Sequence, residues 1–172
     1  FLESLLAAHD REKVELFCYS NVLREDAFTG RFRQLAGKWC SITGMGDEQV
    51  ANLIRTDAID ILVDLAGHTA HNRLRVFARK PAPVQVTYLG YPNTTGLSAM
   101  DYRLTDAYAD PPGMTEHLHT EQLVRLPESA WCFHPSEDAP PVASAPVAST
   151  GGITFGCFNA RLKITDEMVK LW

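Results

Sequence analysis

The sequence predicts an α/β fold in which a parallel sheet is covered by helices. Along the 172 residues, the spacing of apolar side chains switches repeatedly between a helical and a strand-like period, as it does when strands and helices alternate. Hydrophobic residues make up 45% of the chain and charged residues 22%, so the chain is long enough for one domain with an apolar core. Glycines and prolines separate the periodic segments into short elements.

The first forty residues predict two helices and a strand. Residues 1–6 have the apolar spacing of an amphipathic helix. Residues 14–18 alternate between apolar and polar side chains, which predicts a strand. Phenylalanine and leucine then recur every three to four positions, which predicts a helix over about residues 25–38.

A helix leads from there into the most apolar run of the chain. Asp47 is placed to cap the start of this helix, whose inward face consists of Val50, Leu53 and Ile54. The run that follows, Ile59–Leu65, is apolar enough for a strand covered on both faces. We therefore expect it to be the central strand of the sheet.

The next segment places a turn-rich loop after a strand. A short helix is expected over residues 72–79, because prolines follow at positions 81 and 83, and the next strand is expected over Val84–Leu89. Loops such as Gly90–Gly96, beyond the carboxyl end of a strand, are where ligands bind in open α/β sheets. Two further short strands are expected over Tyr102–Leu104 and Gln122–Leu126.

The composition changes after residue 134. Residues 135–152 are rich in Pro, Ala, Ser and Gly and have no periodicity, which predicts a linker between a first lobe at 1–134 and a second at 153–172. The second lobe is expected to begin with a strand, Ile153–Phe158, and a helix capped by Thr165. Because both ends of the chain fall in helical patterns, we expect the chain to be part of a longer protein.

Composition restricts the class of partner. The chain has 16 Lys and Arg against 21 Asp and Glu, a formal net charge of −5, and no basic block, so we expect no nucleic-acid partner. It has no apolar run of membrane-spanning length and no signal-peptide pattern, so we expect no membrane association and a cytoplasmic location. The four cysteines lie far apart, which fits buried thiols better than disulfides or a zinc site.

Candidate ligand-binding residues stand after the strands. Asp64, His68 and His71 would share one face of a continuous helix, as metal ligands do, but Gly67 and the strand pattern interrupt it, so we expect no metal there. The backbone of the Leu89–Gly96 loop could approach a ligand closely, although a purely structural turn would use the same residues.

Lys163 is the third candidate, because it stands just before a predicted helix start. Its charge, together with exposed backbone N–H groups, would suit a phosphate, although a solvated surface lysine has the same sequence pattern. No G-x-S-x-G, P-loop or G-x-G-x-x-G motif is present, which removes the usual support for a hydrolase, a nucleotide hydrolase or a simple dinucleotide-binding protein.

Several stretches resemble the catalytic region of the protein O-GlcNAc transferase and Spindly family. They cover nearly the whole chain apart from the linker, and comprise Asp60–Ala70, Asn72–Leu74, Pro81–Leu97, Asp101–Arg103, Thr105–Asp106, Asp110–Pro112, Glu121–Pro127 and Phe155–Lys163.

The resemblance implies a glycosyltransferase of GT-B architecture, in which two Rossmann-like lobes face each other across a cleft. This chain would form most of the N-terminal lobe and the start of the second lobe. In the family, a nucleotide sugar binds mainly to the second lobe, and the sugar passes to Ser or Thr hydroxyls with inversion and without a metal or other cofactor. Tetratricopeptide repeats that collect protein substrates usually precede the catalytic region.

The resemblance also assigns roles to individual residues. Lys163 matches the lysine that holds the donor diphosphate, where a fixed cation stabilises the charge that develops in the transition state. Residues that would contact the donor or its sugar are Leu89, Gly90, Pro92, Asn159 and Lys163. Residues on the acceptor side would be His68, Thr69 and Thr94.

We therefore expect a cytoplasmic protein O-glycosyltransferase that uses UDP-GlcNAc, and two alternatives stay open. The sequences of residues 67–70 and 91–96 resemble Spindly more closely, and plant Spindly members are protein O-fucosyltransferases that use GDP-fucose. Ala160 stands at a position where the GlcNAc transferase branch often has an amide side chain. The other alternative is a repeat-bearing interaction scaffold that binds a nucleotide sugar without turnover.

Overall fold

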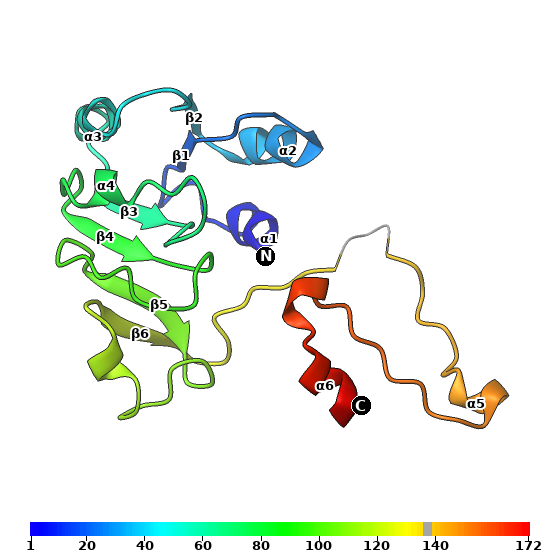
Figure 1. Cartoon of the computed structure of the whole chain (residues 1–172). Helices are drawn as coiled ribbons and strands as arrows, with labels where there is room; N and C mark the ends of the chain where they lie inside the picture. Colours follow the sequence, from blue (N-terminus) through cyan, green and yellow to red (C-terminus); the bar gives the residue numbers. More distant parts are fainter. Residues whose placement is uncertain (136–138) are drawn as a thin grey trace. The chain divides into compact units, whose positions relative to one another are not determined.

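The computed structural model describes residues 1–135 and 139–172 and divides into two compact units, Phe1–His134 and Pro135–Trp172 (Figure 1). The first unit holds all the strands and the apolar core described below. No helix in the described part of the chain has the length and apolar character needed to cross a membrane.

Two parallel sheets form the frame of the first unit. Strand β1 (Phe17–Ser20) pairs with β2 (Lys38–Ser41), and a second sheet has the strand order β3-β4-β5-β6, seen as four aligned arrows in Figure 1. The four strands are Ile61–Asp64, Val84–Thr87, Tyr102–Asp106 and Gln122–Leu126. All the strand pairs are parallel, which confirms the predicted α/β class and brings the carboxyl ends of neighbouring strands to one edge.

Three helices and one 3₁₀ turn connect these strands, and a further helix precedes β1. They are α1 (Leu2–Ala7), α2 (Ala27–Leu35), α3 (Asp47–Thr56), α4 (Leu74–Phe77) and η1 (Glu116–Leu118). Asp26 begins α2, because its carboxylate accepts the N–H of Thr29 at 2.8 Å. Asp47 is not the cap of α3 as predicted: Gly46 is the N-cap, its N–H donates to Oε1 of Gln49 at 2.9 Å, and Asp47 is the first helical residue.

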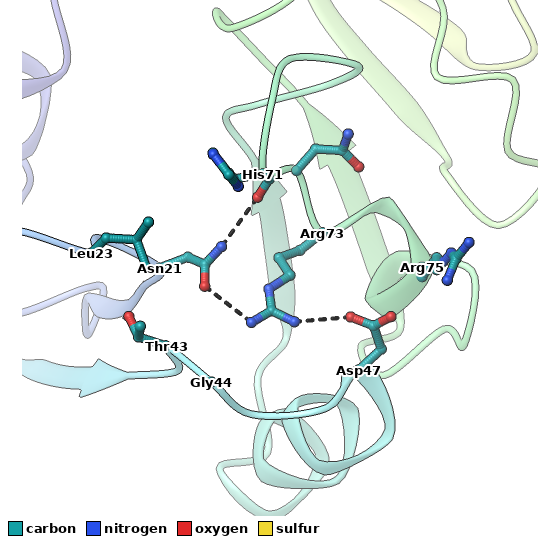
Figure 2. Close-up of a pocket in the computed structure, with 9 residues that line it drawn as sticks. Asn21, Leu23, Thr43, Gly44, Asp47, His71, Arg73 and Arg75 are labelled. Carbon is teal, nitrogen blue, oxygen red and sulfur yellow. Dashed lines mark hydrogen bonds and ion pairs between the residues drawn. The ribbon is translucent and has the colours of Figure 1, made fainter.

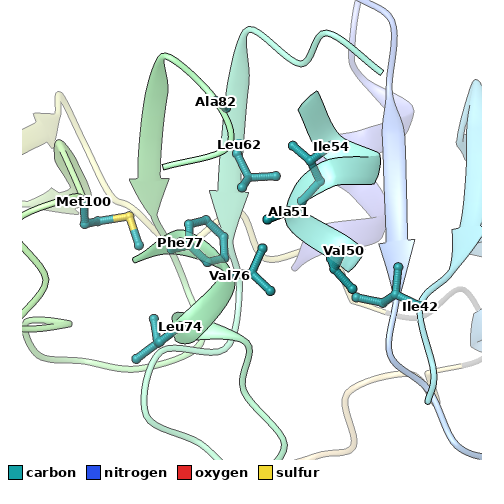
Figure 3. Packing of buried hydrophobic residues seen from close by; sticks show 10 residues of the cluster. All are labelled: Ile42, Val50, Ala51, Ile54, Leu62, Leu74, Val76, Phe77, Ala82 and Met100. Carbon is teal, nitrogen blue, oxygen red and sulfur yellow. The ribbon is translucent and has the colours of Figure 1, made fainter. Parts of the chain in front are cut away.

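The apolar core lies between α3, α4 and one face of β3 (Figure 3). Val50 and Ile54 of α3 are buried as predicted, and Leu62 of β3 faces them. The buried cluster comprises Ile42, Val50, Ala51, Ile54, Leu62, Leu74, Val76, Phe77, Ala82 and Met100. It fixes α3 and α4 against the sheet and so determines where the loop between β3 and α4 begins.

The prediction of β3 as a central strand covered on both faces was wrong. The strand lies at one end of the four-stranded order, and Ile61 and Val63 are exposed on the face opposite Leu62. An apolar run indicates that a strand tends to be buried. Its place in the strand order depends on pairing with distant segments, and local composition does not specify that pairing.

Two other boundaries differ from the predictions. The helix expected over residues 25–38 ends at Leu35, since Ala36 is extended, and β2 begins at Lys38, where no strand was predicted. Strand β1 begins at Phe17, three residues after the expected start of the alternating segment.

The second unit contains three short helical segments. They are α5 (Val147–Thr150), the 3₁₀ turn η2 (Arg161–Lys163) and α6 (Asp166–Leu171). Thr165 caps α6 as predicted, because its hydroxyl oxygen accepts the N–H of Met168 at 3.3 Å.

The strand predicted over Ile153–Phe158 is not formed. Its side chains are largely exposed, and residues 139–172 contain no strand with which it could pair. The predicted linker, residues 135–152, includes residues 136–138, which lie outside the described residues, and α5 occupies part of the rest.

Candidate functional site

The loops that follow β3 and β4 touch at the carboxyl edge of the four-stranded sheet. A Cβ atom on Gly90 would lie 2.0 Å from the carbonyl oxygen of Leu65, and one on Gly67 would lie 2.3 Å from Cβ of Tyr91. Atoms at these positions would overlap, so both glycines are needed where the loops cross. The close backbone approach expected of the 89–96 loop is therefore made to the neighbouring loop.

Asp64, the last residue of β3, shapes the first of these loops. Its buried carboxylate accepts the N–H groups of Ala66 at 3.1 Å and Gly67 at 2.9 Å, and the hydroxyl of Thr87 donates to it at 2.9 Å. The residue grouped with His68 and His71 in the sequence thus serves as an internal hydrogen-bond acceptor. Among residues 1–135 and 139–172, no group of three or more His, Cys, Asp and Glu side chains is placed to hold a metal ion.

Two of the residues expected on the acceptor side lie on this same loop. The imidazole of His68 packs edge-on against the ring of Tyr91, with centroids 5.3 Å apart and an interplanar angle of 76°. The Thr69 hydroxyl donates to the carbonyl oxygen of Ala66 at 2.8 Å. Since His68 and Thr69 are both exposed, the fold presents an imidazole and a hydroxyl beside the 89–96 loop.

The 89–96 loop begins with a strained residue. Leu89 has a φ of 70°, in the left-handed region that costs a residue with a side chain about 1–2 kcal/mol. Such strain persists only where the surroundings over-determine the conformation, and it is concentrated at functional sites. Gly90 and Pro92 are exposed, as expected of residues that would meet a ligand.

A small pocket of about 130 Å³ lies beside the strained residue. It is bounded by the ends of β4 and β5 and by the segment after β6. Its lining residues are Tyr88, Leu89, Tyr91, Pro92, Arg103, Leu104, Thr105, Ala109, Ala130 and Trp131. The pocket and the 89–96 loop therefore belong to one region at the carboxyl edge of the sheet, where α/β folds bind ligands.

Two buried charged residues, which the sequence did not single out for a role, contact the loop. Nη1 of Arg103 donates to the carbonyl oxygens of Tyr91 at 2.9 Å and Asn93 at 3.1 Å. Glu121 accepts the N–H of Thr95 at 2.7 Å and also the hydroxyls of Thr94, at 2.7 Å, and Thr95. Arg103 stands between Tyr102 and Leu104 in a short predicted strand. A charged residue in that position is the feature of the sequence that could have pointed to its role.

The environment of Glu121 keeps it ionised. Burial alone would raise the pKa of this carboxyl, but the hydrogen bonds from the hydroxyls of Thr95 and Thr94 and from the N–H of Thr95 outweigh burial, and the pKa lies below its ordinary value. The Thr94 hydroxyl, expected on the acceptor side, also accepts the N–H of Gly96 at 3.0 Å and is engaged within the fold.

A larger pocket of about 440 Å³ opens at the carboxyl ends of β1 and β2 (Figure 2). Arg73 lies at its centre, between Asn21 and Asp47 in the figure. The Arg73 guanidinium donates to the side chains of Asn21 and Asp47, both at 3.0 Å, and to the carbonyl oxygens of Met45, at 3.0 Å, and Ile42, at 3.1 Å. Arg73 is the N-cap residue of α4, so these four bonds tie the start of α4 to α3 and to the segments after β1 and β2.

The remaining expected site residues, Asn159 and Lys163, belong to the second unit. Lys163 ends η2 two residues before the cap of α6, and its side chain is exposed. Oδ1 of Asn159 accepts the N–H of Ala160 at 3.0 Å.

Comparisons with known proteins agree with this geometry. The model of glycosyl transferase family 41 matches residues 1–134. The chain is 49% identical over 176 residues to a tomato protein and 33% identical over 181 residues to one from Arabidopsis thaliana, which cover 100% and 98% of the chain. Both relatives are named probable UDP-N-acetylglucosamine:peptide N-acetylglucosaminyltransferases, SPINDLY and SEC respectively. The chain spans only 19% and 18% of their lengths.

A solved structure of a mutant Thermobaculum terrenum O-GlcNAc transferase is also similar. Its sequence is 48% identical, its TM-score is 0.81, and the match covers 84% of this chain and 28% of that one. The parallel α/β frame and these matches place the chain in the class of GT-B-type glycosyltransferase folds. The chain belongs to glycosyl transferase family 41, and the family resemblance inferred from the motifs is confirmed.

Proposed function

We propose that the protein containing this chain is a protein O-glycosyltransferase that transfers GlcNAc from UDP-GlcNAc to Ser or Thr hydroxyls. The observation that supports it is the contact between the loop carrying His68 and the strained 89–96 loop, in a chain 49% identical to a relative named for this transfer. Tetratricopeptide repeats elsewhere in the polypeptide, protein substrates and a cytoplasmic location are parts of the same proposal.

The proposed reaction assigns different tasks to the residues of the chain. The acceptor hydroxyl oxygen bonds to the anomeric carbon and releases its proton to solvent, while the bond from that carbon to the diphosphate oxygen breaks on the opposite face and the nucleoside diphosphate leaves. Leu89, Gly90 and Pro92 contact the transferred sugar, and the Lys163 ammonium, with Asn159 nearby in sequence, holds the departing diphosphate. A cation held there lowers the barrier, because it interacts more strongly as negative charge accumulates.

O-fucosyl transfer from GDP-fucose is the second candidate. It is favoured by higher identity to proteins named SPINDLY: identity is 47–49% to six plant proteins of that name, against 33% to one named SEC. The choice between the two donors depends on contacts to the base and sugar, and the 89–96 loop provides only part of those contacts in this proposal.

The test is a comparison of donors with the full-length protein. Transfer to protein Ser or Thr is measured by intact-mass spectrometry with UDP-GlcNAc and GDP-fucose side by side, together with donor hydrolysis. Transfer of GlcNAc supports the first candidate, and transfer of fucose alone supports the second. Nucleotide-sugar binding with neither transfer nor hydrolysis would establish the non-catalytic scaffold and contradict both.

A further inference from the structure

Two buried charged side chains from outside the 89–96 loop hold the segment Tyr91–Thr95 within it. Of the five residues from Tyr91 to Thr95, four hydrogen-bond to Arg103 or Glu121: two through carbonyl oxygens and two through hydroxyl or N–H donors. Arg103 lies on β5 and Glu121 immediately before β6. The rigid sheet therefore fixes the shape of the loop.

The chemistry of the two contacts is complementary. Arg103 offers N–H donors to the carbonyls at the start of the segment, and Glu121 offers oxygens to the donors at its end. Arg103 and Glu121 are nearly fully buried, at 6% and 4% exposure, so water has little access to their side of these hydrogen bonds. Asp110 lies on the far side of Arg103, with Oδ2 3.6 Å from Nε, and balances its charge.

We propose that Arg103 and Glu121 are positioning residues for glycosyl transfer, which act by holding Leu89–Pro92 in the conformation that receives the donor sugar. This inference rests on the proposed function. The left-handed Leu89 explains why a positioning device is needed, since a free loop would relax from that conformation. A displacement of about 1 Å at a reacting centre can lower the rate about 100-fold.

The test uses four variants of the full-length protein. Arg103→Lys keeps the charge beside Asp110 but loses the fork that reaches two carbonyls. Thr95→Val removes a hydroxyl bonded to Glu121 at nearly constant volume, and Thr95→Ser retains the hydroxyl and should rescue. Arg125→Lys is the matched control, because Nε of Arg125 also donates to a backbone carbonyl, that of Asp110 at 2.6 Å, without touching the loop.

Three readouts together separate positioning from a structural role. For Arg103→Lys and Thr95→Val we expect kcat/KM for the nucleotide sugar to fall by about 10- to 100-fold. Inhibition by UDP or GDP, which lack the sugar, should stay within a few-fold of wild type. Hydrogen exchange in residues 89–96 should accelerate in these two variants only, while Arg125→Lys and Thr95→Ser should resemble wild type in all three measurements.

The outcomes distinguish the two proposals. A wild-type protein that transfers no sugar overturns the proposed function and this inference with it. An active wild type whose Thr95→Val and Arg103→Lys variants match Arg125→Lys in kcat/KM overturns the inference alone. If a variant loses turnover of the nucleotide sugar and sensitivity to inhibition by UDP or GDP to the same extent, the fold is damaged in general. That result would also overturn the inference. If Arg103→Lys fails to fold, the comparison of Thr95→Val with Thr95→Ser tests the inference on its own.

Discussion

Replacing Gly90 by alanine tests the contact between the two loops at the candidate site. A Cβ atom there would lie 2.0 Å from the carbonyl oxygen of Leu65, 2.6 Å from its carbonyl carbon and 3.0 Å from Cα of Ala66. All three neighbours are backbone atoms, so no side chain can rotate away. The loop after β3 and the loop after β4 must move apart.

The size of the effect follows from that geometry. Ordinary carbon contacts are about 3.5–4 Å, so relief requires a displacement of about 1–2 Å. Overpacking of this kind costs about 1–3 kcal/mol, and the upper end applies because backbone must shift. For a chain of this length, 3 kcal/mol corresponds to a fall in Tm of about 6–12 °C. Displacement of the 89–96 loop should also lower transfer about 100-fold.

The assay is denaturant unfolding and sugar transfer of Gly90→Ala beside a matched glycine variant. Gly30 lies within α2 and a Cβ there meets no atom within 4 Å, so Gly30→Ala should stabilise the protein by about 0.5–1 kcal/mol and leave transfer unchanged. If Gly90→Ala unfolds within about 0.5 kcal/mol of wild type while Gly30→Ala behaves as stated, the loops do not cross as described.

Three further predictions address the core, a titrating carboxylate and the proposed catalytic cation. Phe77 is 6% exposed in the core and Phe28 is 56% exposed, so Phe77→Ala should lower the free energy of unfolding by about 3–5 kcal/mol and Phe28→Ala by less than about 1 kcal/mol, by denaturant titration. Because the pKa of Glu121 is lowered by folding, its carboxylate stabilises the protein fully above the ordinary carboxyl range of about pH 4–5, and this stabilisation is lost as the pH falls through the folded-state pKa. The difference in Tm between wild type and Glu121→Gln should therefore become smaller on acidification. A difference that does not change with pH would contradict this. Lys163→Ala should lower transfer about 100- to 1000-fold with Tm nearly unchanged, Lys163→Arg should keep partial activity, and turnover of Lys163→Ala within a few-fold of wild type would refute the role.

The fold class could be predicted because it depends on local periodicity. Each strand of the four-stranded sheet was predicted within a few residues, since alternating or continuous apolar runs bounded by Gly and Pro are local signals. Strand β2 could not be predicted, because it has four residues, two of them exposed, and directly follows a helix. The position of β3 at the end of the strand order depends on pairing partners, which sequence periodicity does not specify.

The candidate site could be located but not explained from the sequence. The 89–96 loop was predicted at the carboxyl end of a strand, and it lies there, with His68 beside it. The roles of Arg103 and Glu121 depend on contacts between residues 10 to 27 positions apart in the chain, and nothing in their immediate neighbours specifies them. The combined action of Lys163 and Asn159 with this loop is part of the proposed function.

Buried carboxylates at the carboxyl edge of the sheet bear on which part of the donor this edge contacts. Asp106, the last residue of β5, accepts the N–H groups of Ala130, Ala109 and Tyr108, and these bonds hold its pKa below the ordinary value. Asp64, the last residue of β3, also accepts two backbone N–H groups, those of Ala66 and Gly67. Carboxylates fixed in this way repel a diphosphate, whereas the hydroxyls of a neutral sugar can donate to backbone carbonyls at such an edge. We therefore expect this edge to contact the neutral sugar and the acceptor, and the positive charge required by the leaving diphosphate to come from a cation outside it, which is the role proposed for Lys163.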